Sequence, residues 1–205
     1  MIITLVANEK NLGVLHNKAK TVFLASNDWV ILLDSDNSIG KDYLDKLIEI
    51  EDLCDKYFYC PQILNGDENY LKGDKKFLFN YKSCLDKKID MQFIKDNIYL
   101  KNKELNTELT ILLNSGNYFV NKEYYIKAYK SINHNIKKEY DPCDVFYFNY
   151  HFLLNVEGAH ITAVKGLQYY HRVHKGSIYI NNAKRNQEIN NELVKNIVSL
   201  KLNEA

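Results

Sequence analysis

Several features that mark common protein classes are missing from this chain of 205 residues. Its 27 basic and 26 acidic residues leave a formal net charge of only +1, so there is no positive excess to attract nucleic acid. Its four cysteines form no C-x-x-C pair, and no group of histidines and cysteines has the spacing of a zinc site. The composition therefore argues against a nucleic-acid-binding protein and against a zinc domain.

Long hydrophobic runs are lacking as well. No apolar run approaches the roughly 20 residues that a helix needs to cross a bilayer. The opening stretch MIITLVANEK has a short apolar run with no basic segment before it, which is not the pattern of a secretory signal. We therefore expect a cytoplasmic protein with no transmembrane segment, whose cysteines are reduced and buried.

The chain does have the material for a folded α/β domain. Apolar residues make up 46% of it, enough for a sizeable core. Apolar runs predict buried strands at 2–7 and 29–33, and helical spacing of apolar residues predicts helices at 14–25 and 38–54. The uninterrupted run WVILL is typical of a parallel strand that is covered on both faces. We therefore predict a mostly parallel central sheet flanked by helices.

The rest of the chain continues this alternation less regularly. Further strands are predicted at 57–64, 109–113, 117–120 and 160–164. Further helices are predicted at 122–129, 144–156 and 183–201. We expect residues 1–180 to form one domain and residues 181–205 to add an amphipathic helix that packs on it.

The stretch WVILLDSDN ends a predicted buried strand with two acids, Asp34 and Asp36. Ligands of open α/β sheets bind beyond the carboxyl ends of the strands, and residues i and i+2 of an extended segment point the same way. A divalent cation would relieve the repulsion between the two carboxylates, and their hard oxygen atoms suit Mg²⁺ or Mn²⁺. Such an ion can hold a diphosphate leaving group. The alternative is a solvated acidic turn that caps the next helix.

The longer stretch NEKNLGVLHNKAKTVFLASNDWVILLDSDN resembles the inverting, family-2-type glycosyltransferases of Rossmann-like GT-A fold. That family has an N-x-G turn, a helix, and an apolar strand that ends in D-x-D. The matching residues here are Asn11, Gly13, Asp34 and Asp36. The resemblance implies that all four bind a nucleoside-diphosphate sugar, with a Mn²⁺ or Mg²⁺ ion on the two acids.

Two later segments resemble the same family in the same order. LNSGNYFVNKEYY is similar to a glycine–asparagine segment that would place Gly116 and Asn117 near the donor sugar or the acceptor. YYHRVHKGS is similar to a loop that closes over the diphosphate. There the resemblance implies His171 as a third metal ligand and Arg172 and His174 as donor contacts. For each histidine, an ordinary hydrogen-bonded loop residue is the alternative.

The family's general base is the second acid of a pair at the start of a helix. EYDPCDVFYFNYHFLLNVEG matches that region, with Asp144 as the first candidate and Asp141 as the second. The pattern departs at Cys143, where glutamate is common. Asp144 could also simply cap its helix, and one residue can do both.

The resemblance begins late, because the run at 2–7 matches the third strand of the family. The two strands that would bind the nucleobase and ribose are absent, and Lys18 stands where Asn or Arg is common. Three explanations are open: a fragment of a longer protein, a homodimer or partner chain that completes the nucleotide pocket, or a relative that binds without turnover.

The sequence thus predicts a metal-dependent glycosyltransferase that moves a sugar, with inversion, to a hydroxyl on a glycan, lipid-linked or protein acceptor. The first alternative is a glycan- or nucleotide-binding module, or a subunit of a glycosylation complex. The second is a HAD-like phosphohydrolase, because ILLDSDNS also resembles a D-x-D-x-[TV] motif whose first acid is a nucleophile.

Overall fold

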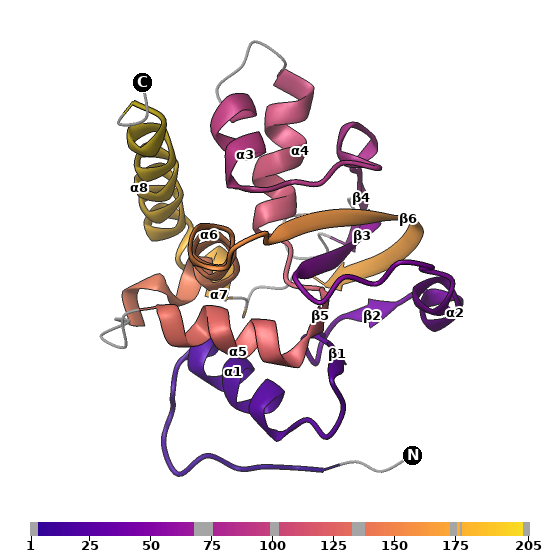
Figure 1. Ribbon diagram of the computed structural model, residues 1–205. Coiled ribbons are helices and arrows are strands. Elements are labelled where there is room, and N and C mark those ends of the chain that lie inside the picture. Colours follow the sequence, from indigo (N-terminus) through magenta and orange to yellow (C-terminus); the bar gives the residue numbers. More distant parts are fainter. Residues whose placement is uncertain are drawn as a thin grey trace.

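The computed structural model describes residues 4–67, 76–98, 103–132, 138–172, 176 and 178–202. Within these residues one curled sheet is surrounded by helices (Figure 1). The strands are β1 (Trp29–Ile31), β2 (Ser38–Ile39), β3 (Tyr57–Asp67), β4 (Lys76–Asn80), β5 (Phe119–Asn121) and β6 (His160–Arg172). The α-helices are α1 (Val14–Leu24), α2 (Tyr43–Ile48), α3 (Met91–Asn97), α4 (Lys103–Leu113), α5 (Lys122–Ser131), α6 (Asp144–Asn155), α7 (Ile178–Asn181) and α8 (Ala183–Leu202). Two 3₁₀ turns are η1 (Lys82–Cys84) and η2 (Lys138–Cys143).

The sheet is mostly antiparallel and curls strongly into a half-barrel, so the predicted mostly parallel, Rossmann-like GT-A sheet is wrong. Its order is β1-β5-β3-β6-β2, with β4 paired to the outer part of β3. Among the described strands, β3 and β6 form the one parallel pair, from Tyr57 opposite His160 to Asp67 opposite Arg172. The physical reason is the placement of β5, which lies between β1 and β3 and runs opposite to both.

Two predicted strands are not strands in the structure. Residues 4–7 of the predicted strand 2–7 lie outside the sheet, with Leu5 94% exposed, and residues 2 and 3 are outside the described part of the chain. The described residues therefore give β1 a strand partner on one side only, which is β5. The run at 109–113 forms the end of α4, where Leu109 and Leu113 are buried one helical turn apart.

The predicted helices are largely confirmed. Segments 14–25, 122–129, 144–156 and 183–201 correspond to α1, α5, α6 and α8. The predicted helix 38–54 is helical only in its middle, because β2 occupies its start, and Ile48 is 82% exposed. Gly158 follows α6 with φ +74°, as expected of a residue that ends a helix.

The main core lies between one face of the sheet and the helices. Its centre is a stack of aromatic rings in which Phe58 of β3 meets Phe152 of α6, with ring centroids 3.6 Å apart. The last helix joins this core through Ile189, Leu193 and Ile197. A smaller cluster of Tyr43, Leu47 and Leu167 packs α2 on the other face of the sheet.

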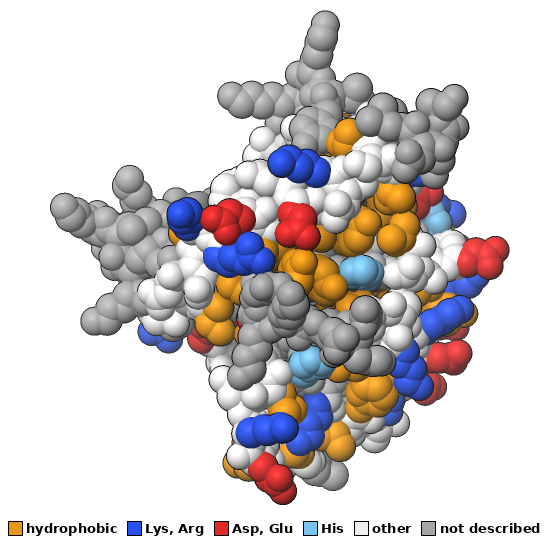
Figure 2. All heavy atoms as spheres, turned by 90° about the vertical axis from the view of Figure 1, so that its left-hand side faces the viewer, with side chains coloured by type: hydrophobic (Ala, Val, Ile, Leu, Met, Phe, Trp, Pro, Cys, Tyr) orange, Lys and Arg blue, Asp and Glu red, His pale blue; other side chains and the backbone are white. Residues whose placement is uncertain are grey.

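Three further features are the state of the cysteines, the apolar length of the helices and the distribution of charge on the surface. The four cysteines are free, and Cys54 is the one that is not fully buried. No helix in the described part of the chain is long and apolar enough to cross a membrane. On the face shown in Figure 2, acidic and basic side chains are interspersed instead of gathering into one charged patch.

Candidate functional site

The first part of the candidate site is the N-x-G turn, which fixes the start of α1. The side-chain oxygen of Asn11 accepts a hydrogen bond from the Gly13 N–H at 2.8 Å. Asp141 Oδ1 of η2 accepts one from the Val14 N–H at 3.0 Å, so this carboxylate caps the helix. Gly13 has φ +86°, and a Cβ there would lie 2.9 Å from Asp141 Oδ2. Asp141 therefore acts as a cap of α1, and Asp144 is the better-placed candidate for the general base.

A pocket of about 410 Å³ opens beside this turn. The residues that line it are Asn8, Lys10, Asn11, Leu12, Gly13, Val14, Asn17, Asp141 and Ile178. Three predicted site residues therefore share one pocket, although Asp141 is far from the other two in the sequence. Amide, carboxylate and ammonium groups in its lining suit a polar ligand.

Replacing Gly13 by alanine is expected to lower the free energy of unfolding by about 2 kcal/mol, because a side chain at positive φ is strained and would crowd the Asp141 cap. Urea denaturation measures the change. Gly116→Ala is the matched control, since an added Cβ there meets atoms no closer than 3.5 Å. Equal losses of stability in the two variants would contradict the assignment of strain to Gly13.

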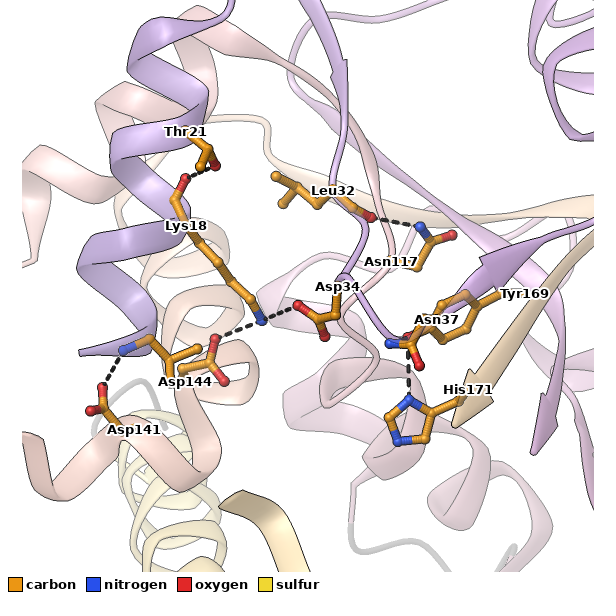
Figure 3. Close-up of polar contacts among 11 residues, drawn as sticks. Lys18, Thr21, Leu32, Asp34, Asn37, Asn117, Asp141, Asp144, Tyr169 and His171 are labelled. Carbon is orange, nitrogen blue, oxygen red and sulfur yellow. Dashed lines mark hydrogen bonds and ion pairs between the residues drawn. The ribbon is translucent and has the colours of Figure 1, made fainter. Parts of the chain in front are cut away.

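The centre of the site is a lysine between two acids (Figure 3). Lys18 Nζ of α1 lies 3.0 Å from Asp144 Oδ2 at the start of α6 and 3.5 Å from Asp34 Oδ1 after β1. The Lys18 and Asp144 side chains are 18% and 12% exposed, whereas Asp34 is 41% exposed. Leu15, Ala19 and Val22 anchor the neighbouring stripe of α1 in the core, and Lys18 borders this stripe at i+3 from Leu15 and i−4 from Val22.

Burial raises the pKa of the Asp144 carboxyl, and the Lys18 ammonium only partly opposes this effect. The pKa of Lys18 is also raised: burial acts to lower it, but the negative charges of Asp144 and Asp34 outweigh burial. Lys18 is therefore a stable cation. Asp144 is a carboxylate with an increased affinity for a proton, which is the property that a general base needs.

The glycine–asparagine segment contributes two residues with different positions. A Cβ on Gly116 would lie 3.6 Å from Asp34 Oδ2 and 3.7 Å from Lys18 Nζ, so Gly116 borders the charged cluster. Asn117 is fully buried behind it, where its amide donates to the Leu32 carbonyl and accepts from the Tyr43 hydroxyl, both at 2.6 Å. Asn117 therefore supports the strand end that carries Asp34.

The turn after β1 is tied to the end of β6. Asn37 Nδ2 donates to the Tyr169 hydroxyl at 2.6 Å, and Asn37 Oδ1 accepts from the backbone N–H of Arg172 at 2.8 Å. The same hydroxyl lies 3.3 Å from His171 Nδ1. Burial, followed by the charges of Asp34 and Asp36, raises the pKa of Tyr169.

His171 and the turn that carries both acids therefore meet at the Tyr169 hydroxyl, which Asn37 contacts from the turn. Arg172 is exposed at the end of β6, and His174 lies outside the described residues.

The donor set suits a metal ion that arrives with a phosphate ligand. In the described part of the chain, no group of three or more His, Cys, Asp or Glu side chains is placed to hold one ion. Two carboxylates such as Asp34 and Asp36 nevertheless fit Mg²⁺ or Mn²⁺ when substrate phosphates and water complete the coordination. The residues therefore fit a metal–diphosphate site better than a site made of protein ligands alone.

Lys18 is the site residue that sequence reasoning missed. It stood out only as a departure from the family pattern, and its contact with Asp144 spans 126 residues of sequence. The one available signal was its place on α1, about one turn after the N-x-G turn.

Comparison with known proteins assigns no family to the chain. No protein-family model matches it, and a search of curated proteins finds no significant match. The geometry of the site is therefore the basis on which a function can be proposed.

Proposed function

We propose that this protein is a metal-dependent glycosyltransferase that transfers a sugar from a nucleoside-diphosphate donor to a hydroxyl acceptor with inversion. One observation carries the proposal: residues from three separate segments, each of which the family resemblance singles out, lie together in space. Asp34, Gly116 and Asp144 surround Lys18. The charges of Asp34 and Asp36 both raise the pKa of Tyr169. An acidic turn that merely caps α2 does not account for this gathering.

The chemistry follows from the positions of the acids. Asp144 takes the proton of the acceptor hydroxyl, whose oxygen forms a bond to the anomeric carbon while the bond from that carbon to the diphosphate breaks. A single displacement of this kind inverts the configuration, and the nucleoside diphosphate leaves. Asp34 and Asp36 would hold the divalent ion, which when bound supplies Lewis-acid stabilisation of the leaving group. Lys18 keeps Asp144 ionised through their 3.0 Å contact.

Among the described residues, β1 pairs with a strand on one side only, which favours a second candidate, a binding module that needs another chain for turnover. A strand with one free edge can accept a strand from a partner, which would add a wall beside the acids. Turnover by the purified chain alone would exclude this candidate.

Calorimetric titration with UDP and GDP, with and without Mn²⁺, tests the proposed site. We expect nucleotide binding that requires Mn²⁺ and that weakens at least about tenfold in Asp36→Ala, because one hard oxygen ligand is lost. Asp45→Ala is the matched control, since it removes an equal charge from the exposed surface of α2. A folded protein that binds neither nucleotide, or whose binding is the same in both variants, would contradict the proposal.

A further inference from the structure

The positive charge of Lys18 lies beside Asp34, one of the two acids that the proposed function assigns to a divalent ion. Its ammonium group contacts Asp34 at 3.5 Å while it holds Asp144 at 3.0 Å. We propose that Lys18 is a built-in counterion of this site, which a divalent cation must displace from Asp34. The site would then accept the cation only together with a diphosphate. This inference rests on the proposed function and adds a rule for the order and coupling of binding.

The geometry indicates which of the two contacts is given up. Asp144 is the closer partner and its side chain is 12% exposed, so its pair with Lys18 is shielded from water. Asp34 is farther from the ammonium and 41% exposed, which leaves it open to an incoming ion. An ion that binds Asp34 therefore replaces the weaker and more accessible of the two contacts, and Lys18 stays with Asp144.

A divalent cation that binds without a nucleotide is repelled by the positive charge of Lys18, and the site is partly buried. Lys18 is held beside the site by its 3.0 Å pair with Asp144, on a helix that Leu15, Ala19 and Val22 anchor in the core. A divalent ion on Asp34 would sit near an ammonium group that keeps its charge, and this repulsion is screened less than at an open surface. The negative charges of a diphosphate offset both cations at once. Metal and nucleotide are thus expected to bind with strong positive coupling.

Gly116 fits the same account. A Cβ at this position would lie 3.7 Å from Lys18 Nζ and 3.6 Å from Asp34 Oδ2, in the space beside the charged pair. The absence of a side chain leaves room for the ammonium and the carboxylate to separate when an ion arrives.

The test compares Mn²⁺ binding by the full chain and by Lys18→Met, which keeps the length of the side chain and removes the charge. Mn²⁺ affinity is measured by electron paramagnetic resonance, alone and with saturating UDP or GDP. We expect Lys18→Met to bind Mn²⁺ alone about tenfold more tightly than the unaltered protein, and the increase in affinity caused by nucleotide to shrink by a similar factor. Lys20→Met is the control, because Lys20 lies on the same helix but bonds Asn8 instead of the acids.

A second variant keeps the test decisive if Lys18→Met folds poorly because Asp144 is left buried without its partner. Lys18→Met combined with Asp144→Asn removes both charges of the buried pair and leaves Asp34 available, and we expect the same tighter binding of Mn²⁺ alone. Unchanged Mn²⁺ affinity in the folded variants, with nucleotide-dependent binding intact, would overturn this inference and leave the proposed function standing. Failure of every protein to bind Mn²⁺ with nucleotide would overturn both.

Discussion

Replacing Asp144 by asparagine is expected to lower kcat by roughly 10²- to 10⁴-fold, the usual cost of removing a general base. Asparagine keeps the shape of the side chain and can still accept a hydrogen bond from Lys18, so the site should remain assembled. Donor binding, measured by calorimetry, should change little, because the proposed role of Asp144 is to act on the acceptor. The loss is therefore expected in turnover and not in donor affinity.

Asp141→Asn is the matched control, because Asp141 caps α1 and does not contact Lys18 in any interaction described above. We expect it to keep most of the stability and most of the turnover, because asparagine caps a helix about as well as aspartate. The pH profile gives a second measure. The base must be ionised, so the rate falls as pH drops below its pKa, and the raised pKa of Asp144 moves this acidic limb above the range usual for an aspartate. Equal turnover in Asp144→Asn and the unaltered protein would contradict the proposed role of Asp144.

Replacing Phe152 by alanine is expected to lower the free energy of unfolding by about 3–5 kcal/mol, among the largest effects of a single core substitution. Its ring is fully buried and stacks on Phe58, which itself lies near Phe148 at the centre of the main core. Truncation leaves a cavity between β3 and α6 that rigid neighbours cannot close. Urea denaturation followed by circular dichroism measures the change.

Phe23→Ala provides the comparison for this prediction. Its ring is 42% exposed on α1 and meets Tyr129 edge-on, with centroids 6.0 Å apart. We expect a loss below about 1 kcal/mol, because little apolar area is removed from the interior. A similar loss in both variants would mean that the aromatic stack is not the centre of the core.

Sequence pattern predicted the helices well because each presents its apolar residues to one side. In α8 the predicted stripe residues Ile189, Leu193 and Ile197 are all buried. The run LTILL misled the same reasoning, since a short apolar run suits a buried strand and a buried helix equally. Its helical state becomes visible only when Leu105 is included one turn earlier.

The direction of the strands could not be read from the sequence. The run WVILL suggests cover on both faces but does not identify the neighbouring strand. That neighbour is β5, which is almost a hundred residues away in the chain and antiparallel to β1 (Trp29 opposite Asn121). Strand pairing over such separations depends on tertiary packing that no local pattern reports.

Sequence reasoning selected the acidic residues of the candidate site but did not identify the lysine that lies between them. Asp34 and Asp144 were identified through the resemblance, and the structure brings both to one ammonium group. Lys18 itself is one of many lysines, and only its departure from the family pattern and its place after the N-x-G turn mark it as different. The double role of base and cap considered for Asp144 also needed the structure, in which Cys143 is the N-cap of α6 without a side-chain cap bond and Asp141 caps α1.

The pairing of β3 with β6 has a consequence for how the protein is made. Tyr57 is opposite His160, so the central strands of the sheet are about a hundred residues apart in the chain. On the ribosome, the outer part of β3 can pair with β4 soon after both emerge, but its inner residues Tyr57–Pro61 must wait for β5 and β6. We therefore expect the sheet to close late in synthesis, with slow folding and a nascent chain that depends on chaperones until β6 has emerged.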